Sequence, residues 1–180
     1  MKTNAPSFEA IEPSFGSSFS FSTFDENANS KAHLWHYHPE IELVYVNGGS
    51  GKRQIGSHIS YYTDGDLILI GSYLPHCGFT NEQTGNKKET VIHLKSDFLG
   101  SAFFERPEMK NISNLFIKAK GGLAFSGETK KLVGHQISAM EGLSNFEKLL
   151  ALIRVLNDLE QSGDFKILNA EGFSLETQSL

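Results

Sequence analysis

The chain has 180 residues, of which 39% are hydrophobic and 21% are charged, which is enough apolar material for one globular domain with its own core. Sixteen Lys and Arg residues against 21 Asp and Glu residues give a net charge of −5, so the chain lacks the general positive field that attracts nucleic acid. Cys77 is the only cysteine, which excludes an internal disulfide framework and fits a reducing compartment. Because the sequence shows no secretory signal and no apolar run of membrane-spanning length, we expect a soluble cytoplasmic protein that does not bind membranes.

The first 126 residues are rich in Gly, aromatic and β-branched residues, and they predict a series of short strands. Polar and aromatic residues alternate in residues 17–24, which is the period of a half-buried strand. Gly-rich turn signals separate several of the later candidates, and this spacing favours an antiparallel sandwich or barrel. The further predicted strands are residues 41–47, 52–56, 58–63, 66–70, 75–80, 89–95 and 122–126.

Helical spacing of leucines begins after Glu128. It predicts one helix over residues 129–141 and a second over 145–161, with Ser144 and Glu147 placed as a capping box for the second. Residues 97–118 are divided by Pro107 and are expected to form only short helical turns. The residues therefore predict a mainly β fold, an antiparallel sandwich or barrel followed by a C-terminal pair of α-helices.

The second predicted helix carries a broad apolar face that includes Leu149, Leu152, Ile153 and Leu156. This face is wider than a helix needs when it covers one surface, so it could contact both the barrel and a second subunit. Packing within the core of the same chain is the alternative. We predict a homodimer that uses these four leucine and isoleucine side chains.

The strongest chemical signal is the arrangement of His36, His38 and Glu42, to which His76 is added from another predicted strand. Two histidines spaced by two residues point the same way along a strand, and a carboxylate after a short turn can join them. Pro39 is expected to mark that turn, because proline cannot donate to a strand ladder. His33 and His93 are left outside this predicted site.

Three interpretations of these four residues stay open. Three imidazoles and one carboxylate suit a divalent transition metal such as Zn, Fe, Mn or Ni. The same side chains could instead bind a small molecule directly, or they could form a polar cluster that binds nothing. Since convergent buried polar groups are costly unless something satisfies them, a ligand of some kind is favoured.

Two stretches resemble a known superfamily. Residues 36–49 (HYHPEIELVYVNGG) resemble the first motif of the cupins, and the stretch from Gly65 to His76 resembles the second. Residues 33–76, together with FLGSAFFERPEM (98–109), GGLAFSGETKK (121–131) and the leucine-rich helices, further resemble the N-terminal sensory domain of AraC-type transcription regulators. The resemblance covers nearly all of residues 15–175.

The resemblance implies a cupin-like jelly-roll barrel with an N-terminal arm over residues 1–126, a dimerising helical hairpin over 127–163 and a linker over 164–180. It implies a regulator that binds a small-molecule effector, such as a sugar, in the barrel and is not an enzyme. DNA would be contacted only through a helix-turn-helix domain outside this chain, since residues 128–180 hold five basic and eight acidic residues. The alternative function is a metal-dependent cupin enzyme, an oxygenase or isomerase, that uses the same three histidines and glutamate.

Overall fold

The structure is a computed structural model that describes residues 5–25, 34–77 and 88–170. No helix within these ranges is long and apolar enough to cross a membrane. In chain order the elements are β1 (Ser7–Phe8), β2 (Ser20–Asp25), β3 (His36–Tyr37), β4 (Ile41–Asn47), β5 (Ser50–Ile55), β6 (His58–Thr63), β7 (Asp66–Ile70), β8 (Lys88–Leu94), α1 (Ser101–Phe104), the 3₁₀ helix η3 (Pro107–Met109), α2 (Lys110–Ala119), β9 (Leu123–Phe125), α3 (Gly127–Ala139), α4 (Asn145–Ser162) and β10 (Phe165–Ile167).

Six strands form one sheet in the order β10-β9-β7-β4-β8-β2. Every neighbouring pair in this sheet is antiparallel. Strands β5 and β6 form a second antiparallel pair, and β1 pairs in parallel with β3. The mainly β, antiparallel architecture with helices in the C-terminal part, as predicted from the sequence, is confirmed.

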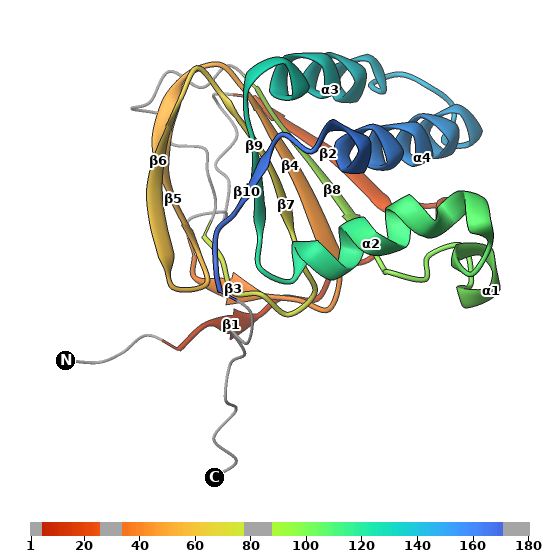
Figure 1. The fold of residues 1–180 in the computed structure, drawn as a ribbon, viewed down its shortest axis with the longest axis horizontal. Coiled ribbons are helices and arrows are strands. Elements are labelled where there is room, and N and C mark those ends of the chain that lie inside the picture. The colour runs from red at the N-terminus through yellow and green to blue at the C-terminus, as the bar shows by residue number, and fades with distance from the viewer. Residues whose placement is uncertain (1–4, 26–33, 78–87, 171–180) are drawn as a thin grey trace, which may run out of the picture.

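The two faces of the six-stranded sheet pack against different layers. Successive side chains of a strand point to opposite faces. In β4, Leu43 belongs to the core cluster that includes the helices, whereas Val44 belongs to the cluster that includes β5 and β6. Figure 1 shows α2, α3 and α4 on one side of the sheet and β5 and β6 on the other. Glu42 has the parity of Val44, so the sequence of β4 directs this carboxylate between the two sheets.

Helix α4 lies between α2 and α3 and contacts both. The predicted capping box is present, since the side chain of Ser144 accepts from the backbone N–H of Glu147, whose carboxylate in turn accepts from the N–H of Ser144. The helix ends where Gly163 adopts a left-handed conformation with φ 62°. Local sequence chemistry alone therefore fixes both ends of this helix.

Helix α2 corrects the prediction of short helical turns over residues 97–118. Pro107 stands at the first position of η3, where its missing N–H is not needed, so it starts the helical segment instead of dividing it. Four side chains of α2 recur at helical spacing and are buried, and this face holds the ten-residue helix on the sheet. They are Ile112, Leu115, Phe116 and Ala119.

Two residues of the predicted dimer face are core residues. Leu152 and Leu156 are both 0% exposed and belong to the cluster shared by the helices and the sheet. They offer no surface to a second chain, so the prediction is wrong for these two side chains and the core-packing alternative holds. Leu149 and Ile153 are half-buried at the margin of the same cluster.

The segment after α4 is part of the fold, which corrects the prediction of a linker over residues 164–180. Strand β10 pairs with β9 and forms one edge of the large sheet. Just beyond it, the buried side-chain amide of Asn169 donates to the carbonyl oxygens of Ile55 and Gly121. These bonds join the segment to β5 and to the turn before β9. Residues 171–180 lie outside the described residues.

Two predicted strands also change. Residues 75–77 form no strand, and His76 makes only isolated bridges to His36 and Ile55; residues 78–80 of that prediction lie outside the described ranges. The strand predicted at residues 17–24 begins at Ser20, because a turn closed by the N–H of Ser17 and the carbonyl oxygen of Ser14 precedes it.

Candidate metal centre

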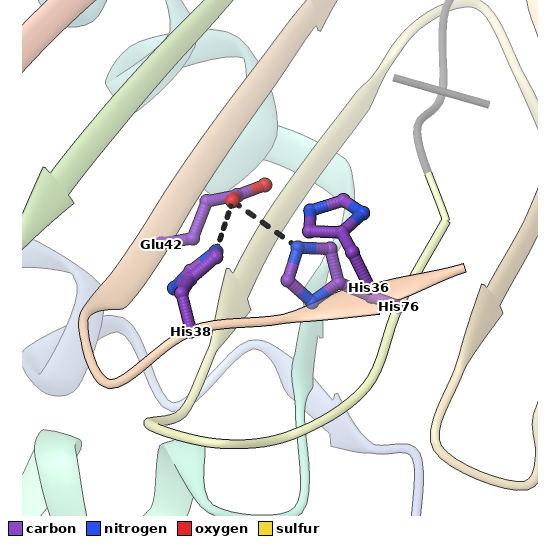
Figure 2. A group of neighbouring side chains, drawn as sticks. All are labelled: His36, His38, Glu42 and His76. Atoms are coloured by element: carbon purple, nitrogen blue, oxygen red, sulfur yellow. Dashed lines mark hydrogen bonds and ion pairs between the residues drawn. The ribbon is translucent and has the colours of Figure 1, made fainter. Parts of the chain in front are cut away.

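Three segments bring the predicted site residues to one end of the barrel. His36 lies on β3, His38 follows it on the same side, and the chain bends at Pro39 before β4 begins. His76 is fixed next to His36 by two backbone hydrogen bonds, of 3.0 and 2.9 Å, between these two residues. Figure 2 shows the three imidazoles gathered beside the carboxylate of Glu42.

The four side chains each present one ligand atom, and these atoms all lie within 4.8 Å of one another. Oε2 of Glu42 is 2.9 Å from Nε2 of His38 and 3.2 Å from Nε2 of His76. His38 and His76 are each 1% exposed and Glu42 is 5% exposed. The side chain of His36 is 12% exposed, so the accessible side of the cluster lies beside this residue.

Each of the three imidazoles directs Nδ1 at a backbone carbonyl oxygen, which can only accept a hydrogen bond. Nδ1 therefore carries the proton, and Nε2 of the neutral ring carries a lone pair. This is the arrangement in which backbone carbonyls orient histidines that bind a metal through Nε2. The distances are 2.7 Å from His36 to Leu34, 3.2 Å from His38 to Glu40 and 2.9 Å from His76 to Leu74.

This orientation leaves a deficit of positive charge in the centre of the cluster. With Nδ1 protonated, the Nε2 lone pairs of His38 and His76 face Oε2 of Glu42, which is itself only an acceptor when ionised. Either extra protons on the rings or one metal ion must lie between these atoms. A single divalent cation satisfies all of them without placing several imidazolium ions side by side, so the donor set fits a transition metal.

The pKa values agree with a site that attracts positive charge. Without a metal ion, extra protons on the rings take its place. Burial alone would raise the pKa of Glu42, but the charge of protonated His76 and the hydrogen bonds that the rings of His38, His76 and His93 then donate hold it well below its ordinary value. Burial likewise opposes protonation of His76, and the Glu42 carboxylate outweighs it and raises the pKa of that imidazole. For His36, burial and the neighbouring charge of His76 lower the pKa.

His93, which the sequence analysis set aside, contacts the cluster directly. It lies on β8 opposite Glu42 in the register of β4 and β8, and its Nε2 is 2.9 Å from Oε2 of Glu42. Its Nδ1 is 3.0 Å from the hydroxyl of Ser20, which can donate to it. A neutral His93 thus donates from Nε2 to Glu42 and orients the carboxylate. The sequence predicts that His93 and Val91 lie on the same face of their strand, because they are two residues apart. It does not predict that β8 pairs with β4.

Glu9 is a second residue that the sequence did not indicate. Its carboxylate oxygen is 3.1 Å from Nε2 of His36. Strand β1 positions it, because the N–H groups of Ser7 and Glu9 donate to the carbonyl oxygens of Trp35 and Tyr37, at 3.0 Å each. The N-terminal segment that the sequence suggested as an arm therefore lies against the accessible side of the cluster. His33 lies outside the described residues.

Comparisons with known proteins found similar solved structures but no matching family model and no matching curated protein. A cupin 2 conserved barrel domain protein from Rhodopseudomonas palustris is 18% identical with a TM-score of 0.34, covering 52% of this chain and 66% of that one. A variant of apo ToxT from Vibrio cholerae is 13% identical with a TM-score of 0.47, covering 86% of this chain and 59% of that one. ToxT bound to a naphthalenyl butenoic acid is 10% identical with a TM-score of 0.45, covering 84% and 60%.

This chain therefore spans about three fifths of the ToxT chains. Likeness of this degree does not define the chemistry of a site, and the roles of His36, His38, Glu42 and His76 rest on their own geometry.

Proposed function

We propose that this chain is the ligand-sensing domain of an AraC-type transcription regulator, with a divalent transition metal held by His36, His38, Glu42 and His76. The metal would offer a coordination position to a small-molecule effector in the barrel. A sugar has the neighbouring oxygen atoms that such a position accepts. The proposal makes the chain a binding module and not a catalyst.

One observation carries the proposal: the Nδ1 atoms of three histidines all point at backbone carbonyls, while the Nε2 atoms of two of them meet a buried carboxylate oxygen. A cluster that only stabilised the fold would need no such common orientation. Without a metal ion, the ring lone pairs that face Glu42 would gain a donor only if buried imidazoles were protonated side by side, which costs free energy.

Metal binding is tested first. Wild-type protein stripped with a chelator should bind one equivalent of Zn²⁺ or Mn²⁺, and the metal should raise the unfolding temperature. The His38→Ala and His76→Ala variants should lose both effects. His135→Ala is the matched control, because His135 is exposed on α3 and its loss should change neither. The proposal would be refuted if wild-type protein and His38→Ala bound Zn²⁺ and Mn²⁺ equally well.

The alternative is a metal-dependent cupin enzyme, an oxygenase or isomerase, built on the same four residues. The exposure of His36 favours it, since an enzyme needs a coordination position that substrate can reach. Catalytic conversion of a small molecule by the metal-loaded chain, lost in His38→Ala, would establish the enzyme. Stoichiometric binding of an effector without conversion would establish the sensor.

Dimerisation remains part of the proposal, with a changed surface. On α4, Phe146 is 68% exposed and Leu150 is 53% exposed, and the half-buried Leu149 and Ile153 lie on the same helix. These apolar side chains, and not Leu152 or Leu156, would contact a second copy. DNA would be bound by a helix-turn-helix domain outside this chain, and the cytoplasm is where such a regulator would act.

A further inference from the structure

A cavity borders the metal centre, and none of the four proposed ligands lines it. It has a volume of about 260 Å³ and lies between the N-terminal segment before β2 and the ends of β4 and β8. His93 lines it and also donates to Glu42, so the cavity and the cluster are neighbours. The lining residues are Ile11, Pro13, Ser18, Phe19, Ser20, Glu40, His93, Leu94, Lys95, Asp97 and Phe98.

Glu40 gives this cavity its chemistry. The residue is only 6% exposed, and its Oε2 atom has no hydrogen-bond partner among the described residues. Nδ1 of His38 is 3.9 Å from this oxygen, but that nitrogen is 3.2 Å from the backbone oxygen of Glu40, to which it donates. A buried carboxylate oxygen without a donor costs free energy, so Glu40 would be stabilised by one N–H or O–H group. Because this oxygen has almost no accessible surface, the carboxylate must turn towards the cavity to meet such a donor.

The other walls indicate which donor fits. Phe19 and Phe98 meet edge to face with their ring centroids 6.2 Å apart, and both line the cavity together with Leu94. Aromatic rings beside a buried carboxylate favour an ammonium group, because the ring faces and the carboxylate both attract positive charge. The lining also includes the exposed side chains of Asp97 and Lys95, so it holds two acidic residues and one lysine.

We propose that this cavity binds a small organic amine, with its ammonium group against Glu40 and its compact apolar body against Phe19 and Phe98. The volume is that of roughly eight or nine water molecules at about 30 Å³ each, which suits a compact amine and not an extended chain. The site stands apart from the proposed function, since none of the four metal ligands takes part and the amine does not need the metal.

The test uses benzylammonium as the probe, with benzyl alcohol and benzoate as its neutral and anionic counterparts. Binding to the whole chain is followed by ¹⁵N chemical-shift changes in the presence of a chelator, so that no amine can bind through a metal ion. Benzylammonium should shift the amides of Ser20, Glu40 and Lys95. It should bind at least about tenfold more tightly than benzyl alcohol, which is the effect of a hydrogen bond to a charged group.

Glu40→Gln is the decisive variant, because it keeps the shape of the side chain and removes its charge. It should weaken benzylammonium at least about tenfold and leave benzyl alcohol unchanged. Asp97→Asn, at the exposed rim, is the matched control and should change the affinity less than Glu40→Gln does. Equal affinity of the three probes for wild-type protein, shifts located elsewhere, or no benzylammonium binding at millimolar concentration would each overturn the proposal. The comparison of probes on wild-type protein holds even if Glu40→Gln does not fold.

Discussion

Removing the His93 ring should weaken metal binding although this residue is not a proposed ligand. His93→Ala deletes the N–H donor at 2.9 Å from Oε2 of Glu42 and leaves the hydroxyl of Ser20 without its 3.0 Å partner. The carboxylate then loses the group that fixes its orientation. Loss of such an outer partner lowers metal affinity by about 10- to 100-fold, which is about 1.4–2.7 kcal/mol.

The assay is a competition titration of Zn²⁺ between the protein and a chromophoric chelator. We expect the Zn²⁺ affinity to decrease from wild type to Ser20→Ala and from Ser20→Ala to His93→Ala. The His38→Ala variant should show no measurable Zn²⁺ binding. His135→Ala should match the wild type, because this exposed histidine lies on α3. Wild-type affinity in His93→Ala, with correct folding shown by circular dichroism, would refute the orienting role. Complete loss of binding would instead make His93 a ligand.

Three further predictions concern stability and assembly. Without metal, the lowered pKa of Glu42 contributes stability that is lost as the pH falls below 4.5, and the raised pKa of His76 contributes stability that is lost as the pH rises above 6.5. The lowered pKa of His36 opposes the His76 contribution, so the loss of stability on the acid side should be the larger of the two. Urea unfolding across pH in a chelator measures this, and a flat profile would contradict it. Leu156→Ala should lower the free energy of unfolding by about 2–5 kcal/mol, since the side chain is 0% exposed, whereas Leu150→Ala, at 53% exposed, should cost much less. Leu150→Asp should shift the sedimenting species to monomer while leaving the unfolding temperature near that of the wild type, and an unchanged dimer would remove this part of α4 from the interface.

The features that the sequence predicted well are those with local causes. The strand predicted at residues 41–47 has the bounds of β4, since Pro39 precedes it and Gly48 and Gly49 follow it, and the capping box at Ser144 gives the start of α4. His36, His38 and Glu42 also meet for a local reason, because one bend at Pro39 separates the pair of histidines from the carboxylate. In each case the deciding interactions join residues that are close in the chain.

The features that the sequence missed depend on pairing between distant segments. Nothing near His93 indicates that β8 pairs with β4 in the register that places it opposite Glu42. Strand β10 has only three residues, too few to show a period, and exists because the edge of β9 is available to it. The helical spacing of Leu152 and Leu156 is the same for a helix that packs on its own sheet and for one that packs on a second subunit. Only the position of the sheet in the folded chain shows that both side chains belong to the core.

The two faces of β4 separate the requirements of stability from those of binding. Ile41 and Leu43 point to the helices and are 2% and 0% exposed, so their substitution acts on the core. Glu42 lies between them in sequence and contacts three imidazoles, those of His93 on β8, His38 before β4 and His76 after β7. Because a one-residue shift of β4 against β8 would exchange these faces, it would bury Glu42 among the helices and turn Leu43 towards the histidines. The cost of that exchange holds the carboxylate in register, so the apolar core beneath the helices is also what positions the proposed metal centre.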